Sequence, residues 1–214
     1  MIRDIAIIGK GGFGREVRFL IDEINKVKST YNFLGYFDDD TEKPVDGLPL
    51  IGNLDDLKHY SKKICISVAI GSSSLRKSMI DSLSENTNIE YPNLFHPNVQ
   101  MDVKHVSFGL GNIICSGNIL TTNIFVGDFL ILNLCCTLGH DVIIGNYCSV
   151  MPGVSISGNV TIGEECFIGT GCKIINDKSV GDKVLLGAGC IVIKDIPNGA
   201  VAVGNPARVI KINE

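Results

Sequence analysis

The sequence has no tryptophan, few aromatic residues and no run of basic side chains. Aromatic residues make up 7% of its 214 residues, and 19 lysines and arginines stand against 23 acidic residues, which gives a net charge of −4. We therefore expect no surface for nucleic acid or for an anionic membrane. Membrane insertion is not expected either, because no apolar stretch approaches the roughly 20 residues of a transmembrane helix.

A secretory signal and a metal motif are also missing. The apolar run at 5–8 is short and ends in glycines, without the ordered regions of a signal peptide. We therefore expect a cytoplasmic location, and in that compartment the eight cysteines should stay reduced. No two cysteines form a C-x-x-C pair, so the sequence offers neither a zinc site nor a thioredoxin-type motif.

The first half of the chain alternates apolar strands with helical patterns. Hydrophobic residues make up 45% of the sequence, which is enough for a sizeable core. Strand–helix alternation predicts an α/β domain over 1–97, a small half-Rossmann-like parallel sheet with covering helices. The expected strands cover 4–9, 33–37, 64–70 and 89–94, and short helices are expected near 53–60 and 74–85 as well as after the first strand.

The second half carries an aliphatic residue at every sixth position. The series runs without a miss through Ile114, Leu120, Val126, Leu132, Leu138, Ile144, Val150, Ile156, Ile162, Ile168, Ile174, Val180, Leu186 and Val192. A period of six fits a solenoid of triangular coils, 18 residues each, with one short strand on each side. We therefore predict a parallel β-helix over 98–214, with the frequent glycines supplying positive φ at its corners.

Five cysteines share one place in this repeat. If the periodic aliphatic residue is the first of its hexad, the fifth place holds Cys136, Cys148, Cys166, Cys172 and Cys190. Small apolar packing inside the coil explains this better than a redox role.

These patterns together resemble the left-handed parallel β-helix acyltransferases. The closing VGNPAR (203–208) is similar to the segment that ends many of these enzymes. The amino-terminal Gly9-x-Gly11-Gly12-x-Gly14 narrows the resemblance to the sialic acid O-acetyltransferases and their relatives that N-acetylate nucleotide-linked amino sugars in bacterial glycan synthesis. The resemblance covers essentially the whole chain.

The resemblance implies an acetyl-CoA-dependent acetyltransferase that assembles as a homotrimer. The favoured acceptor is a nucleotide-linked 4-amino-4,6-dideoxy sugar. O-acetylation of a sialic acid or related sugar is the alternative within the same chemistry. A non-catalytic nucleotide-binding trimer is the alternative from another class of protein.

The glycine loop is the candidate acceptor site. It lies between a strand and a helix, where backbone N–H groups cradle phosphate, and Asp38 at the end of the next strand can bind a ribose hydroxyl or a base N–H. NAD stays possible, but a domain of fewer than 100 residues favours a nucleotide sugar. The resemblance implies substrate contacts from Gly11, Gly12, Phe13, Asp38, Asp39 and Gly71. Phe13 stands where many relatives have histidine, which puts the contacts of that histidine in doubt.

His140 and Asp141 are the candidate catalytic pair. His140 occupies the third place of its hexad, which we expect at an outer corner, and Gly158 lies 18 residues further on the next coil. Histidine suits the task of a general base, and a neighbouring carboxylate can orient its ring. The Gly158 N–H is the candidate donor to the oxyanion. A glycine beside the histidine also leaves room for the thin pantetheine arm of acetyl-CoA.

The resemblance also implies coenzyme contacts further along the coils. They fall on Ser149, Gly158, Thr170 and Ala188, and no metal is required. Ser149 replaces a histidine of many relatives. The remaining histidines are less promising as site residues, and His105, which precedes the regular repeat, is either a surface or a structural residue.

Overall fold

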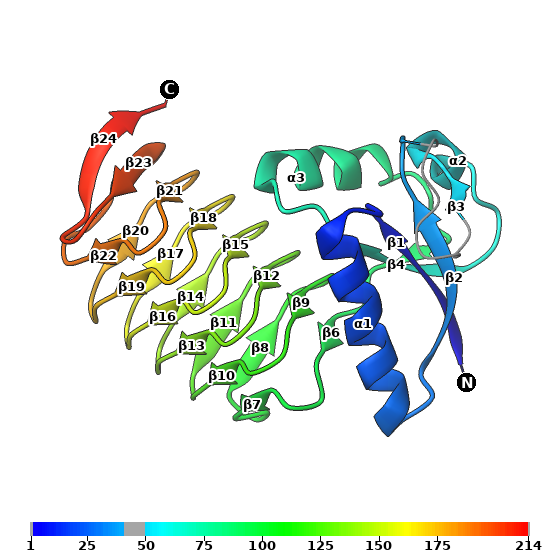
Figure 1. Cartoon of the computed structure of the whole chain (residues 1–214), viewed down its shortest axis with the longest axis horizontal. Helices are drawn as coiled ribbons and strands as arrows, with labels where there is room; N and C mark the ends of the chain where they lie inside the picture. The colour runs from blue at the N-terminus through cyan, green and yellow to red at the C-terminus, as the bar shows by residue number, and fades with distance from the viewer. Residues whose placement is uncertain (1, 41–49, 214) are drawn as a thin grey trace. The chain divides into compact units, whose positions relative to one another are not determined.

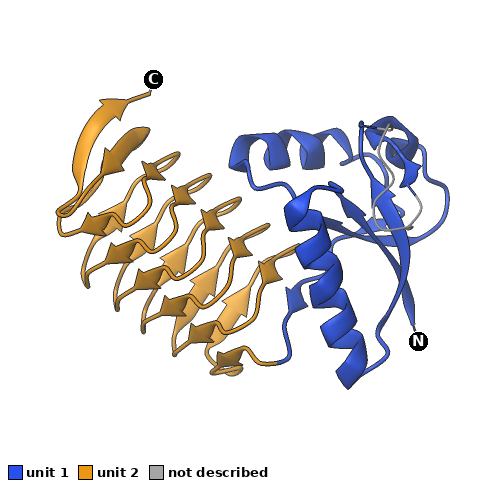
Figure 2. Cartoon of the chain, in the orientation of Figure 1, with its two compact units in different colours: residues 1–97 blue, residues 98–214 orange. Residues whose placement is uncertain are grey.

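The computed structural model describes residues 2–40 and 50–213. The chain divides into two compact units, residues 1–97 and residues 98–214, which Figure 2 shows in different colours. None of the described helices combines the length and the apolar character that crossing a membrane requires.

The first unit contains the predicted parallel sheet, in the order β3-β2-β1-β4-β5 (Figure 1). Its strands are β1 (Arg3–Ile8), β2 (Tyr31–Phe37), β3 (Leu50–Gly52), β4 (Ile64–Val68) and β5 (Ile89–Glu90), and its helices are α1 (Gly12–Val27), α2 (Leu54–Lys58) and α3 (Ser73–Ser82), with β6 (Leu94–Phe95) following. Strand β3 was not predicted, because its three residues form no apolar run of their own.

The centre of this sheet is apolar on both faces. Every residue of 5–8 in β1 and of β4 is buried, as expected for central strands of a parallel sheet. Helix α1 packs with Val17, Leu20 and Ile21 inward. Gly14 in its first turn must be glycine, because a Cβ there would collide with the carbonyl oxygen of Gly9. The helix therefore begins in contact with the loop that precedes it.

The second unit is a solenoid of short parallel strands on three faces (Figure 1). The first face, in chain order, holds β7 (Gln100–Met101), β10 (Ile119–Leu120), β13 (Thr137–Leu138), β16 (Ser155–Ile156), β19 (Lys173–Ile174) and β22 (Ile191–Val192). The second face holds β8 (Val106–Phe108), β11 (Ile124–Val126), β14 (Ile143–Ile144), β17 (Thr161–Ile162) and β20 (Ser179–Val180). The third face holds β9 (Ile113–Ile114), β12 (Ile131–Leu132), β15 (Ser149–Val150), β18 (Phe167–Ile168), β21 (Leu185–Leu186), β23 (Ala200–Val203) and the antiparallel β24 (Arg208–Ile212).

The 18-residue coil is confirmed by the strand register. Ile119 pairs with Thr137, and Thr137 pairs with Ser155, in parallel ladders. All fourteen periodic aliphatic residues are buried. The fold is therefore the predicted left-handed β-helix preceded by an α/β unit.

The cysteines of the fifth place also lie inside the coil as predicted. All five are fully buried, and all eight cysteines of the chain are free thiols. The Sγ atoms of Cys148 and Cys166 contact the carbonyl oxygens of Gly163 and Gly181, each at 3.0 Å. These small side chains thus fill the core and bond to a corner of the next coil.

The prediction that glycines supply the positive φ of the corners is correct only in part, at Gly111, Gly117, Gly153, Gly171 and Gly189. Most corner residues with positive φ carry side chains, among them Phe129 and Tyr147, whose rings stack with centroids 5.3 Å apart. The glycines that follow the periodic aliphatic residues have ordinary φ instead. A Cβ on Gly145 would lie 2.8 Å from the backbone carbon of Gly163. These glycines are needed because successive coils approach closely there.

Gly145→Ala is expected to destabilise the chain, because the added Cβ meets only backbone of the next coil. Overpacking of this kind costs about 1–3 kcal/mol. Urea unfolding should show this loss, while Thr161→Ala, at an exposed strand position on the second face, should change the free energy of unfolding by at most about 0.5 kcal/mol. Equal stability of the two variants would contradict the close-approach explanation.

Candidate active site

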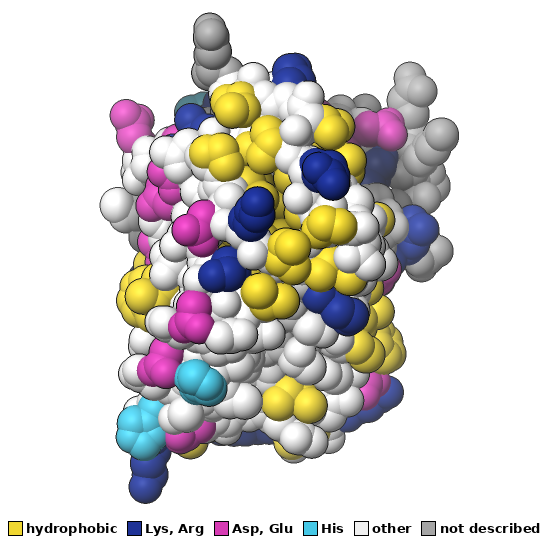
Figure 3. Space-filling view, turned by 90° about the vertical axis from the view of Figure 1, so that its left-hand side faces the viewer, with side chains coloured by type: hydrophobic (Ala, Val, Ile, Leu, Met, Phe, Trp, Pro, Cys, Tyr) yellow, Lys and Arg dark blue, Asp and Glu magenta, His cyan; other side chains and the backbone are white. Residues whose placement is uncertain are grey.

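His140 and Asp141 lie together at the first corner, which joins the first and second faces and comprises 139–141 and its equivalents 121–123, 157–159 and 175–177. The Nδ1 atom of His140 is 2.7 Å from Oδ2 of Asp141. An ionised carboxylate only accepts hydrogen bonds, so Nδ1 carries the proton and Nε2 is left as the basic nitrogen. The side chains are 66% and 46% exposed, so a substrate can reach them. Figure 3 shows histidine side chains close to acidic ones along one edge of the molecule.

Asp141 is held from the preceding coil. Asn123, which stacks 18 residues earlier, donates from its Nδ2 to Oδ1 of Asp141. The bonds from Asn123 and, second, from His140 lower the pKa of Asp141 below its usual value. The carboxylate is therefore ionised at neutral pH and fixed on both oxygens. Sequence reasoning missed Asn123, although the 18-residue period points to it.

Gly158 lies against the imidazole ring of His140. A Cβ on Gly158 would lie 2.5 Å from both Cε1 and Nε2, so only glycine leaves space for the ring in this position. The backbone N–H of Asn159 donates to the carbonyl oxygen of His140 at 2.8 Å and ties the two corners together. Among the described residues the N–H of Gly158 has no acceptor. It is therefore available to a group bound beside Nε2.

Thr170 and Ala188 lie at a different corner, the third, which joins the third and first faces at 169–171 and 187–189. Both side chains are exposed. Each precedes a glycine at which an added Cβ would meet nothing within 4 Å. This corner thus offers a flat strip of backbone, which suits a thin chain such as pantetheine.

The structure does not bring all the expected coenzyme residues together. The first face, with β13, β16 and β19, separates Thr170 and Ala188 from His140. Ser149 is fully buried in β15 on the third face. The residue that replaces a histidine of many relatives is therefore not presented at the surface of the described chain.

The glycine loop of the first unit leaves the start of α1 open. Helix α1 begins after Gly11, whose position lacks a side-chain cap. An added Cβ at Gly11 or Gly12 would meet nothing within 4 Å. Exposed N–H groups at the positive end of a 16-residue helix suit an anion such as phosphate. Phe13 follows, half-buried.

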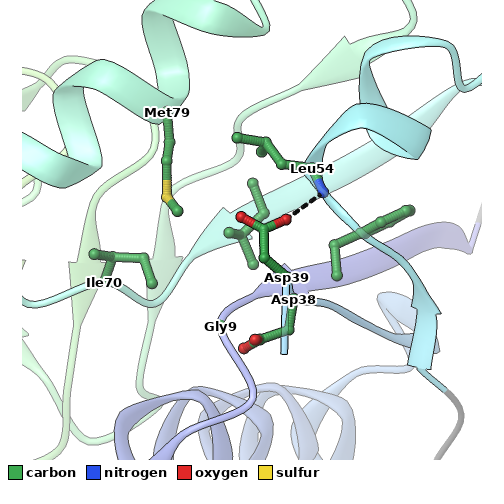
Figure 4. Close-up of a pocket in the computed structure, with 8 residues that line it drawn as sticks. Gly9, Asp38, Asp39, Leu54, Ile70 and Met79 are labelled. Atoms are coloured by element: carbon green, nitrogen blue, oxygen red, sulfur yellow. Dashed lines mark hydrogen bonds between the residues drawn. The ribbon is translucent and has the colours of Figure 1, made fainter. Parts of the chain in front are cut away.

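A small cavity lies beside this loop (Figure 4). Its volume is about 180 Å³, and it is lined by Ile8, Gly9, Phe37, Asp38, Asp39, Leu54, Ile70 and Met79. The lining is mostly apolar with two carboxylates, which suits a ring with polar edges. Gly71 directly follows Ile70, whereas Phe13 is not among the lining residues.

The two carboxylates of this cavity differ in what they bind. Oδ2 of Asp38 accepts from the Lys10 N–H at 2.8 Å, and Oδ1 accepts from the Asp40 N–H at 2.9 Å. Asp38 thus braces the glycine loop. Asp39 accepts from the Leu54 N–H at 3.1 Å through Oδ1 (Figure 4). Asp39 is therefore the better placed of the two to bind a ligand.

Lys10 is a residue of the loop that sequence reasoning missed. Its side chain is only 8% exposed, and its ammonium lies 3.5 Å from the carboxylate of Asp40. Lys10 thus ties the loop to Asp40 at the end of the next strand, through its ammonium and through its backbone N–H on Asp38. Its position between Gly9 and Gly11 of the glycine motif could have identified it as a loop residue from the sequence.

Two family models match the chain, one within each unit. Residues 4–83 match the family described as the PglD N-terminal domain. Residues 141–176 match the family described as bacterial transferase hexapeptide (six repeats).

Similar proteins include enzymes that act on sugars. GDP-perosamine N-acetyltransferase of Escherichia coli O157:H7 is 29% identical over 149 residues, which cover 69% of this chain and 66% of that enzyme. The acetyltransferase domain of PglB from Neisseria gonorrhoeae, solved with acetyl coenzyme A, is 29% identical with a TM-score of 0.88, covering 98% of this chain and 100% of that one. PerB from Caulobacter crescentus, solved with CoA and GDP-perosamine, is 26% identical with a TM-score of 0.85, covering 99% of each chain.

Asn123→Ala should raise the pKa of Asp141, because the strongest bond to its carboxylate is lost. The pKa of Asp141 in the folded protein is lowered, so its hydrogen bonds to Asn123 and His140 are complete near neutral pH and are lost as the pH falls through that pKa. In the variant, protonation of Asp141 should begin at higher pH. A carboxyl-carbon NMR titration measures the shift.

Asn159→Ala is the matched control for this titration. Asn159 donates to Oδ1 of Asp177 at 2.8 Å, one coil further along the same corner, and lowers the pKa of that carboxylate. The control should raise the pKa of Asp177 and leave Asp141 unchanged. An unchanged pKa of Asp141 in Asn123→Ala would show that the hydrogen bond from Asn123 does not lower that pKa.

Proposed function

We propose that this chain, which belongs to the hexapeptide-repeat acetyltransferases with a PglD-type amino-terminal domain, N-acetylates a nucleotide-linked 4-amino-4,6-dideoxy sugar with acetyl-CoA. The observation that carries the proposal is the His140 ring against Gly158, with Asp141 on Nδ1 at 2.7 Å. Relatives named as N-acetyltransferases of GDP-perosamine support transfer to nitrogen rather than oxygen.

His140 acts in the proposed reaction as the general base. Its Nε2 takes a proton from the acceptor amine while the nitrogen attacks the acetyl carbonyl. A C–N bond forms, the C–S bond breaks, and the proton passes from His140 to the departing thiolate. Asp141 stabilises the imidazolium between these steps. The Gly158 N–H donates to the carbonyl oxygen while that oxygen carries negative charge, a contribution that is strongest in the transition state.

The first unit binds the nucleotide part of the acceptor in this proposal. The open N–H groups of Gly11 and Gly12 at the start of α1 suit its phosphates. The cavity next to the loop suits the base or ribose, with Asp39 as the polar contact and Gly71 at its margin. Asp38 contributes by holding the loop, and Phe13 contributes bulk at the helix start.

The proposal includes a homotrimer in the cytoplasm. Thr170 and Ala188 are assigned to acetyl-CoA, and they lie at another corner than His140. A coenzyme held at the third corner of one copy reaches the His140 of a neighbouring copy if the corners meet in a closed ring. Eight free thiols suit a reducing compartment.

His140→Ala should lower the transfer rate about 10²–10⁴-fold, because the general base is lost. Mass spectrometry of the acceptor, with acetyl-CoA and GDP-, UDP- or dTDP-linked amino sugars against free sialic acid, measures the transfer. His59→Ala, at an exposed position after α2, should keep wild-type activity. Near-normal turnover of His140→Ala would remove His140 from its role. Acetylation of sialic acid alone by the wild-type protein would contradict N-acetylation of a nucleotide sugar.

Coexpression of His140→Ala with Ala188→Arg tests whether each site is shared between copies. Each variant alone should be inactive. Each mixed trimer should regain one of its three sites, about a quarter of the wild-type sites over a randomly assembled 1:1 population, because a site then combines His140 of one copy with Ala188 of another. Absence of any regained activity in verified mixed trimers would contradict the shared site.

A further inference from the structure

A second histidine–aspartate pair lies at the start of the β-helix. His105 Nδ1 is 2.7 Å from Oδ2 of Asp102, the same atoms and distance as in the catalytic pair. Asp102 also accepts from Thr122 Oγ1 at 2.9 Å and from the Lys104 N–H at 3.2 Å. Because the ionised carboxylate only accepts, Nδ1 of His105 carries the proton and Nε2 is the acceptor that remains. The His105 side chain is 62% exposed.

Both histidine–aspartate pairs are hydrogen-bonded to adjacent residues of the first corner, Thr122 and Asn123. Thr122 bonds to Asp102, and its neighbour Asn123 bonds to Asp141. The Thr122–Asp102 bond joins the start of the β-helix to the coil that contains Thr122 and Asn123. The Asn123–Asp141 bond joins that coil to the coil of His140. The spacing between the two pairs is therefore fixed by this network rather than by free side-chain rotation.

A groove of about 330 Å³ runs between the pairs on the second face. His105 and Ser107 line one end, and Asp141 and Asn159 line the other. Its lining also includes Phe125 and Ile143, which point outward from β11 and β14 and are 53% and 47% exposed. Apolar side chains beneath a few convergent polar groups form a typical small-molecule site. A deoxyhexose matches this lining, because it has an apolar methyl-bearing side and hydroxyls at its edge.

We propose that His105, oriented by Asp102, determines acceptor specificity: its Nε2 accepts a hydrogen bond from a ring hydroxyl of a sugar that lies on Phe125 and Ile143. This inference rests on the proposed function, since it concerns the sugar whose amine His140 deprotonates. Asp102 acts as a positioning residue, because it touches His105 and not the sugar. The lining of the groove includes Asp141, so a sugar bound there lies next to the pair of His140 and Asp141.

Steady-state kinetics of the full-length protein test the proposal. His105→Ala should raise KM for the nucleotide amino sugar about 3–10-fold, the value of one hydrogen bond, and leave KM for acetyl-CoA unchanged. His105→Gln should restore part of the loss, because its Oε1 also accepts. Asp102→Asn should give an intermediate KM. Lys104→Ala, in the same turn with an exposed side chain, is the matched control and should behave as wild type.

Deoxy acceptors identify the hydroxyl and separate binding from a structural role. With the acceptor that lacks the hydroxyl bound by His105, wild type and His105→Ala should have the same KM. A KM of His105→Ala within twofold of wild type for the intact acceptor would overturn the proposal. So would an equal rise of both KM values, which would show a general disturbance of the fold.

An NMR titration gives a readout that needs no turnover. The nucleotide amino sugar should shift the Hε1 resonance of His105 and leave that of His59 in place. If the wild-type protein acetylates no nucleotide sugar, the proposed function fails. This titration then still shows whether a nucleotide amino sugar binds beside His105. An unshifted His105 at saturating acceptor would overturn the inference even in an active enzyme.

Discussion

The stacking of each residue on the one 18 positions further along is the constraint on which the β-helix and its site depend. It places aliphatic side chains in one continuous core and brings backbone of successive coils within 2.8 Å of where a glycine Cβ would be, as at Gly145. Side chains at a corner are thereby brought against their equivalents in the coils above and below. Asn123 reaches Asp141 by this rule, and Gly158 lies against His140 by the same rule. The site is thus a local consequence of the register.

This register also explains how a rigid scaffold holds the exposed pair of His140 and Asp141, to which we assign catalysis. Both partners are open to solvent, so burial does not orient them. The carboxylate of Asp141 is fixed by two donors, and the imidazole is confined by the backbone of the next coil. Asp141 has a positive φ of 60°, as do the equivalent corner residues Asn123 and Asn159 at 55°. The neighbouring coils therefore orient the His140 and Asp141 side chains, as the walls of a pocket do in a buried site.

Much of this was predictable from the sequence, because a six-residue period has one structural solution. The β-helix, the buried cysteines at the fifth place and the approach of Gly158 to His140 follow from counting residues. The parallel sheet of the first unit follows from strand–helix alternation, and the left hand of the β-helix was implied by the family resemblance. The role of the repeating glycines did not follow, because the period does not distinguish a positive φ from a close approach. The brace between Asp38 and Lys10 depends on loop geometry, which the G-x-G-x-x-G motif leaves open. The burial of Ser149 depends on what packs around β15, and no spacing rule gives that.

A crystal structure of the protein with CoA and a nucleotide-linked 4-amino-4,6-dideoxy sugar tests the central claim most directly. The account predicts the amino nitrogen within hydrogen-bonding reach of His140 Nε2, about 2.6–3.2 Å away, with the Gly158 N–H aimed at the place of the acetyl oxygen. An amino group bound away from the first corner, with His140 facing only solvent, would contradict the assignment of this corner as the catalytic site.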